Sequence, residues 1–238
     1  MVIDRLQAFL GYPYITDTGI KLYSPTIAEI ADMGYLDYMI HLQLSLFDKS
    51  KILLELFRIN FEKYESLKDE NDYDVLIQNQ AIRDYIAKSL SVFVKDTVEF
   101  DENRLAFYVG EVEFINKNNY TKISSAIQEL NAIVDAANPN PKFKNGKAKE
   151  ILDKLNHYRN QHKQKDSLDL KDILSILCAA DGNGINVFNV HQLTIYQAYE
   201  HFERTIVKDK YQRLLPVWAN GYLQENAQLP EWISKTKF

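Results

Sequence analysis

The sequence holds a single cysteine and no long apolar run. One cysteine, Cys178, excludes an intramolecular disulfide and any zinc site built from several cysteines. No segment approaches the roughly 20 apolar residues that a membrane-spanning helix needs, so no membrane partner is expected. Residues 1–13 contain Asp4 and Arg5 and no extended apolar core, a pattern that does not predict a signal peptide. We therefore expect a cytoplasmic protein.

The sequence also lacks the short motifs that carry enzyme chemistry. HExxH, GxSxG, a Walker loop and GxGxxG are all absent. His157 and His162 lie five positions apart, and His191 and His201 lie ten apart, so neither pair shares a helical face. We therefore expect no catalytic and no cofactor-binding residues, and a protein that is not an enzyme. An active site assembled from dispersed residues stays open as an alternative.

The stretch Asp-Gly-Asn-Gly at 181–184 resembles the start of a calcium-binding loop. An EF-hand that starts at Asp181 needs an oxygen ligand, a glycine and a glutamate where this chain has Ile185, Asn186 and Gln192. The pattern instead predicts a joint between two helices. Either glycine of the stretch can end the first helix, and Asn189 can cap the next with Gln192 at capping-box spacing. No metal site is expected here.

The tripeptide Asp17-Thr18-Gly19 matches the one that carries an aspartic-protease carboxylate. Such an enzyme needs two facing aspartates in a β-rich framework, whereas this chain reads as mostly helical. The same three residues are typical of a hairpin turn between two β-prone runs. We therefore interpret residues 12–23 as a hairpin.

Composition indicates a folded protein with a mild acidic excess. Of 238 residues 46% are hydrophobic and 26% charged, and the net charge of −5 argues against a general role in binding nucleic acid. Residues 142–165 form a basic exception, with eight Lys or Arg against two acids. We favour a solvated helix that docks on the acidic body over a contact with nucleic acid or an acidic partner. The candidate basic patch comprises Lys142, Lys144, Lys147, Lys149, Arg159 and Lys163.

Apolar periodicity predicts a mainly α fold with two small β-hairpins in a multi-helix globular domain. The expected helices span about 2–9, 24–47, 49–63, 77–94, 119–137, 147–163, 166–180 and 190–216. The proline- and glycine-containing stretch 139–146 is the best loop or linker. It divides an N-terminal domain (1–138) from a helical C-terminal domain or extension (147–238).

The second hairpin is expected within residues 98–114. A two-residue turn at Glu102-Asn103 would place Phe100 opposite Leu105 and Asp101 opposite Arg104. The apolar positions change parity after Gly110, which predicts a bulge there.

Helix 119–137 carries a coiled-coil-like apolar seam. This seam can pack inside the domain, the interpretation we favour, or against another chain, including a second copy. As a candidate interaction surface it comprises Tyr120, Ile123, Ile127, Leu130 and Val134.

Two stretches carry a resemblance to a known group of proteins. They are ITDTGIKLYSPTIAEIADMGYLDYMIHL at 15–42 and VFNVHQLTIYQAYEHFER at 187–204. Together they resemble tail-module proteins of long-tailed phages of Gram-positive bacteria, among which are tail assembly chaperones. The resemblance covers about a fifth of the chain and includes no catalytic signature.

The resemblance implies a non-enzymatic assembly factor in the cytoplasm of the infected host. Such chaperones coat the tape-measure protein and bring tail-tube subunits to it, so these two tail proteins are the implied partners. The chain is longer than the simplest chaperones, which leaves a virion component of the tail or neck as an alternative. A small enzyme or nucleic-acid-processing factor with an unrecognised site is the other.

Overall fold

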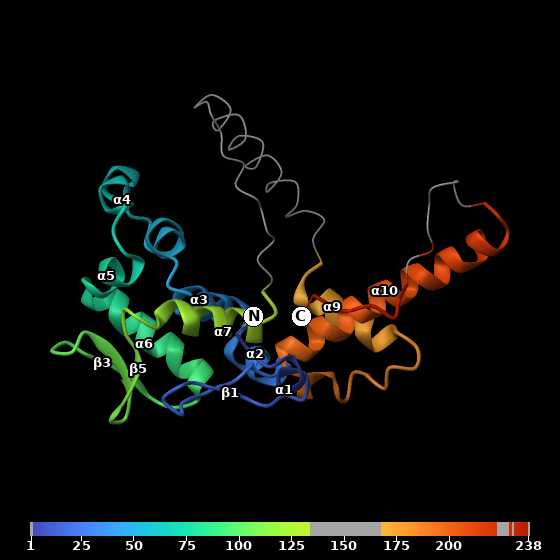
Figure 1. Cartoon of the computed structure of the whole chain (residues 1–238), viewed down its shortest axis with the longest axis horizontal. Helices are drawn as coiled ribbons and strands as arrows, with labels where there is room; N and C mark the ends of the chain where they lie inside the picture. The colour runs from blue at the N-terminus through green and yellow to red at the C-terminus, as the bar shows by residue number, and fades with distance from the viewer. Residues whose placement is uncertain (1, 134–167, 223–228, 230, 238) are drawn as a thin grey trace.

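A computed structural model describes residues 2–133, 168–222, 229 and 231–237 of the chain (Figure 1). The described residues are mainly helical with two small antiparallel sheets, which confirms the predicted fold class. Within them, no helix is both long and apolar enough to cross a bilayer. The elements are α1 (Arg5–Phe9), β1 (Tyr14–Ile15), β2 (Lys21–Leu22), α2 (Ile27–Met33), α3 (Tyr35–Ser45), the π-helix η1 (Lys51–Leu56), α4 (Phe61–Leu67), α5 (Asp72–Ile77), α6 (Gln80–Val94), β3 (Val98–Asp101), β4 (Ala106–Val109), β5 (Val112–Ile115), α7 (Tyr120–Leu130), α9 (Leu170–Ala179), the 3-10 helix η2 (Val190–Gln192) and α10 (Ile195–Ala219).

Helix α6 lies at the centre of the body, packed against α3, α5 and β3. Its apolar residues recur every three or four positions, as an amphipathic helix requires, and Ile86, Leu90 and Phe93 are fully buried. One continuous core joins these residues to side chains from α1, α7, α9 and α10. The expected domain boundary at 139–146, and the helix expected at 147–163, lie outside the described residues.

The predicted helix 24–47 is divided in two. Gly34 has a φ of +94° between α2 and α3, a backbone conformation that only glycine adopts at low cost. Thr26 is the N-cap of α2, and it forms a capping box with Glu29. The predicted helix 49–63 was also wrong in extent, because the π-helix η1 ends at Leu56 and α4 begins five residues later.

The predicted register of the second hairpin was wrong. Phe100 pairs with Phe107 across β3 and β4, and their rings lie 4.9 Å apart. The loop therefore spans four residues, 102–105. The carboxylate of Asp101 accepts hydrogen bonds from the backbone N–H groups of Asn103 and Arg104, at 2.8 and 3.1 Å. This side chain thus builds a turn on its own strand, which takes up the two extra residues.

Strand β5 extends the hairpin to a three-stranded sheet in the order β3-β4-β5. The predicted bulge at Gly110 lies elsewhere: the register shifts between Phe107 and Tyr108, opposite β5. Gly110 instead sits in the tight turn closed by the pair Val109 and Val112. The parity change in the sequence therefore marked a chain reversal.

An antiparallel bridge joins the starts of α2 and α10. Thr26 and Thr194 face each other, and the N–H of Ile27 donates to the carbonyl of Leu193 at 2.8 Å. Each threonine also caps its own helix through a capping box. The two stretches that carry the phage resemblance therefore meet at this point in the fold.

Candidate functional site

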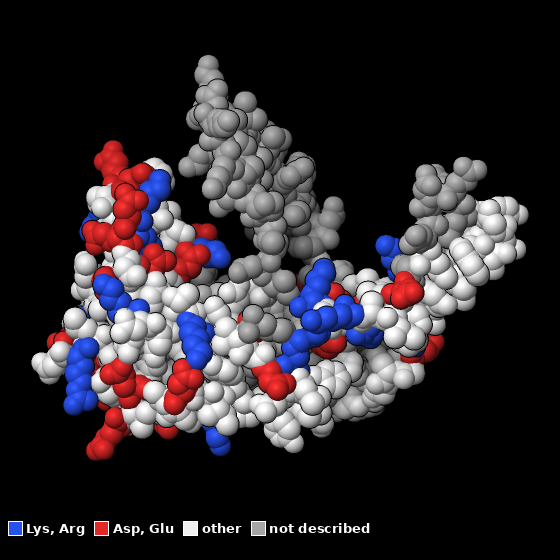
Figure 2. Space-filling model, viewed as in Figure 1, with Lys and Arg blue, Asp and Glu red and all other residues white. Residues whose placement is uncertain are grey.

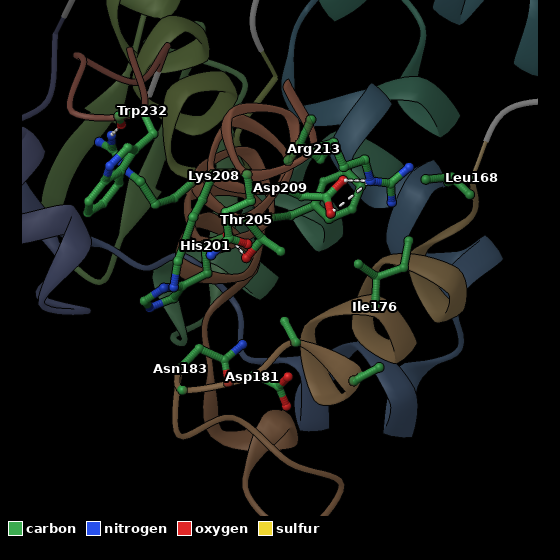
Figure 3. A pocket seen from close by; sticks show the side chains of 17 residues that line it. Leu168, Ile176, Asp181, Asn183, His201, Thr205, Lys208, Asp209, Arg213 and Trp232 are labelled. Atoms are coloured by element: carbon green, nitrogen blue, oxygen red, sulfur yellow. Dashed lines mark hydrogen bonds and ion pairs between the residues drawn. The ribbon is translucent and has the colours of Figure 1, made fainter. Parts of the chain in front are cut away.

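A groove of about 760 Å³ runs between α9 and the middle of α10, from His201 to Arg213 (Figure 3). Helix α9 begins at a capping box between Asp169 and Asp172, and its inward face buries Ile173 and Leu177. The opposite wall is α10, and Trp232 of the C-terminal segment closes one end. The apolar lining comes from Leu168, Ile176, Ala179, Ala180, Phe202, Ile206 and Trp232.

The charged side chains of the groove are mostly paired with nearby groups. The carboxylate of Asp209 accepts from Nε of Arg213 one turn later, with an Oδ2–Nε distance of 2.9 Å. Arg204 donates to the backbone carbonyls of Trp232 and Ser234 at 3.0 and 2.7 Å. The groove is therefore an apolar channel with a charged rim.

His201 is the histidine of the groove, and its ring packs 5.7 Å from that of Phe9. Burial lowers the pKa of His201, and the carboxylate of Glu200 offsets part of that effect. His191 is exposed on η2, whereas His157 and His162 lie outside the described residues. Where the structure describes the chain, no three His, Cys, Asp or Glu side chains gather as metal ligands would.

The C-terminal residues 231–237 are tied back onto the base of α10. Thr236 is buried; its hydroxyl donates to Glu200 at 2.9 Å and accepts from Arg5 at 2.8 Å. The carboxylate of Glu203 accepts from the backbone N–H of Lys237 at 2.9 Å. Together with Arg204, these contacts form a strap that holds Trp232 at the end of the groove.

We expect Arg204→Ala to release this strap without unfolding the chain. The loss of two hydrogen bonds from a charged donor should free residues 231–237 and move Trp232 into solvent. In a Trp218→Phe background, which leaves Trp232 as the single tryptophan, its fluorescence emission should shift to the red. Lys208→Ala, in the same groove, is the matched control. Unchanged emission in the Arg204 variant would show that the strap does not depend on these bonds.

The stretch at 181–184 is a joint between α9 and the next helix, as predicted. Helix α9 ends at Ala179 with Ala180 as an extended C-cap, so neither glycine ends the helix as predicted. Nδ2 of Asn183 donates to the carbonyl of Leu177 at 2.8 Å. Gly182 and Gly184 follow with φ values of +76° and +73°. The candidate ligand Asn183 thus caps a helix.

The predicted capping box at Asn189 was wrong. The side chain of Asn189 donates to the carbonyl of Gly184 and accepts from the N–H of Asn186, so it stabilises the loop. The N-cap of α10 is Thr194, five residues later, which forms a capping box with Gln197. Both positions have the same capping spacing, and the bridge to Thr26 selects the second.

Gly184→Val should lower the free energy of unfolding by about 1–2 kcal/mol, because the left-handed backbone conformation is sterically unfavourable for a residue with a Cβ. A Cβ at this position meets no atom within 4 Å, so the cost comes from the backbone alone. Chemical denaturation measures it. Val187→Ala, at an exposed position of the same loop, should change stability by less than about 0.5 kcal/mol. Equal stability of the two variants would contradict the explanation.

The structure places the predicted interaction seam inside the protein. Ile123, Ile127 and Leu130 are buried in the core, and Tyr120 is partly buried. Helix α7 ends at Leu130, so the predicted end at 137 was wrong, and Val134 lies outside the described residues. The four described residues of the seam pack within the chain, as in the favoured interpretation. The whole basic patch, residues 142–165, also lies outside the described residues.

The groove had no signal in the sequence, because its lining comes from segments that are far apart. Residues 161–237 match the family model described as the YomV second domain, a phage-derived family. This match covers about a third of the chain, and every lining residue of the groove falls inside it. No curated protein and no solved structure matches the chain. The family match indicates a phage protein, in agreement with the coarser part of the resemblance.

Proposed function

We propose that the chain is a non-enzymatic phage tail-morphogenesis protein, a tail assembly chaperone that binds tape-measure and tail-tube proteins in the infected cell. The groove between α9 and α10 carries this proposal, because it lies within the segment that matches the phage-derived family. The resemblance of the stretches at 15–42 and 187–204 supports the more specific assignment.

The shape and chemistry of the groove suit an amphipathic helix. It is bounded by two helices, and its lining includes apolar side chains such as Ile176 and Phe202. An amphipathic helix binds such a groove by laying its apolar face inward. A tape-measure protein is a long helical chain, so it presents this kind of face.

The contacts of the ionisable groups also support a binding role over catalysis. Asp209 is paired with Arg213, Arg204 holds backbone carbonyls, and His201 packs against an aromatic ring. These groups fix the walls of the groove and orient the strap. A general acid or base must be free to exchange a proton with a substrate, whereas these three side chains are already engaged in contacts within the chain.

A pull-down from infected cells tests the proposal with two matched variants. Ala179 lines the groove and is exposed, so Ala179→Arg fills the groove without disturbing the core. Ser175→Arg places the same side chain on an exposed position of the same helix that does not line the groove. We expect the tape-measure protein to be recovered with wild type and Ser175→Arg and to be lost with Ala179→Arg.

Absence of both tape-measure and tail-tube proteins from the wild-type sample would refute the chaperone proposal. Equal recovery with both arginine variants would keep the partner but exclude the groove as its site. Detection of the chain in purified virions at a fixed ratio to tail proteins would replace the chaperone with a structural component.

A further inference from the structure

The outer half of α10 extends away from the body with an apolar stripe on one face (Figure 1). Tyr211, Leu215 and Trp218 are spaced by four and three residues, so their side chains share that face. Trp218 is 54% exposed, and Tyr222, just beyond the helix, is 80% exposed. Figure 2 shows the tip of this helix as a largely uncharged surface. We call residues 205–222 the distal segment; its first turns, up to Arg213, also line the groove.

The distal segment also carries an excess of positive charge. Its charged residues are Lys208, Lys210 and Arg213 against Asp209, which leaves a net charge of +2. Since Asp209 pairs with Arg213, the two lysines account for this excess. Two such segments would repel each other, so a symmetric contact between the distal segments of two copies is disfavoured.

The opposite end of the molecule carries an acidic projection, residues 60–71, which we call the acidic knob (Figures 1 and 2). None of the residues of α4 within it is buried. The knob contains Glu62, Glu65, Asp69 and Glu70 against Lys63 and Lys68, a net charge of −2.

The acidic knob also exposes aromatic surface. Phe61 is 61% exposed and its ring lies 6.4 Å from that of Tyr64, the next aromatic residue of α4. The knob and the distal segment therefore match in two respects: each exposes aromatic side chains, and their net charges are opposite and equal in size.

These two surfaces lie toward opposite ends of the long axis of the chain, so they do not meet within one molecule (Figure 1). We propose that the distal segment of one copy binds the acidic knob of a second copy, in a head-to-tail contact. Such a contact uses different surfaces on the two partners, and it builds a ring or an open chain of copies. The proposal concerns the purified chain and does not depend on the function proposed above.

The aromatic side chains supply most of the affinity in this contact, and the charges set its direction. Tryptophan and tyrosine dominate the binding energy of protein interfaces, whereas exposed ion pairs contribute little individually. Opposite net charges speed the correct encounter and disfavour the symmetric one. With surfaces this small, we expect dissociation constants of roughly 10 to 100 µM.

Sedimentation velocity of the purified full-length chain, over a range of concentrations, tests the proposal. We expect reversible self-association, seen as a sedimentation coefficient that rises with protein concentration, and we expect it to weaken as the salt concentration rises. Trp218→Ala should weaken the association roughly 30-fold, since it removes the tryptophan of the stripe.

Charge reversal gives the sharper test. Variant A carries Lys208→Glu and Lys210→Glu, so its distal segment becomes −2; variant B carries Glu62→Lys and Asp69→Lys, so its knob becomes +2. Each alone should associate about tenfold more weakly, because like charges then meet. In a mixture of A and B, every contact between an A and a B is attractive again, so association should be restored. A control with Lys88→Glu and Lys235→Glu makes the same charge change as variant A, at exposed sites outside both surfaces.

Three results would overturn the proposal. The chain could remain monomeric throughout this concentration range. Variant B could associate as wild type does, which would indicate a symmetric contact through the distal segment alone. The mixture of A and B could associate no better than either variant, which would show that the two surfaces do not meet. Circular dichroism of each variant confirms that the fold is retained.

Discussion

Replacing Lys49 by methionine should lower the free energy of unfolding by about 3 kcal/mol. The side chain of Lys49 is only 5% exposed, and its ammonium group lies 3.5 Å from the carboxylate of Asp72. It donates to the carbonyls of Leu67 and Lys68, both at 2.7 Å, and to that of Glu70. Methionine fills a similar volume but leaves these carbonyls without a donor, and an unsatisfied buried polar group costs about 1–3 kcal/mol.

The same substitution should loosen the acidic knob before the rest of the chain unfolds. The three carbonyls lie at the end of α4 and in the loop that follows, so Lys49 fastens the knob to the body. Hydrogen exchange should therefore accelerate most at residues 60–71. Lys51→Met, at a neighbouring position where the side chain is 53% exposed, should change stability by less than about 0.5 kcal/mol. A loss of similar size at both positions would show that burial of the ammonium group is not the cause.

The role of Lys49 could not have been found in the sequence. A lysine between two apolar stretches is predicted to be exposed, because burial of a charged side chain costs free energy of hydration and nothing nearby in the sequence indicates compensating partners. Its burial depends on carbonyl groups about 20 residues further along the chain, and on a π-helix that has no clear pattern of its own. Polar contacts over such separations are where sequence reasoning fails.

Features that depend on neighbouring residues were predicted more accurately. The turn at Asp17-Thr18-Gly19 and the joint at 181–184 were both predicted, because each depends on residues within a few positions of one another. The prediction of the second hairpin was wrong at its turn. The carboxylate of Asp101 accepts a hydrogen bond from the loop backbone, and the strand pairing is shifted by two residues. A local pattern gave the strands, and a single side chain decided the register.

The candidate groove lies between these two cases. The sequence predicted α9 and α10 individually, from apolar periodicity, but not the space between them. That space depends on the bridge between Thr26 and Thr194, which positions α10, and on the strap that brings Trp232 back to its base. Neither has a sequence signature, because both join segments that are far apart in the chain.

Replacing Tyr73 by alanine should lower the free energy of unfolding by about 4 kcal/mol, as expected for a buried aromatic residue. Its ring is almost fully buried and lies 5.8 Å from Phe47, 5.5 Å from Tyr120 and 6.3 Å from Phe107. The three neighbouring rings come from three segments, the residues after α3, strand β4 and the start of α7. The cavity left by alanine would therefore be lined by large side chains that cannot readily collapse into it.

Tyr73→Phe separates the ring from the hydroxyl. The hydroxyl donates to the carbonyl of Leu105 at 2.9 Å, and burial raises the pKa of Tyr73. Phenylalanine keeps the packing but loses this bond, so we expect a loss of about 1–2 kcal/mol. Leu105 has a φ of +51° and is exposed, which means that its strained turn depends on contacts such as this one. Hydrogen exchange should therefore accelerate at 102–105 in this variant.

The exposed Tyr85 is the matched control, and Tyr85→Phe should change stability by less than about 0.5 kcal/mol. If Tyr73→Phe costs as much as Tyr73→Ala, the hydroxyl rather than the ring holds this part of the core. If it costs nothing and leaves exchange at 102–105 unchanged, the bond to Leu105 does not stabilise the turn. The graded result, with a small loss for phenylalanine and a large one for alanine, is the one that the packing of the four rings requires.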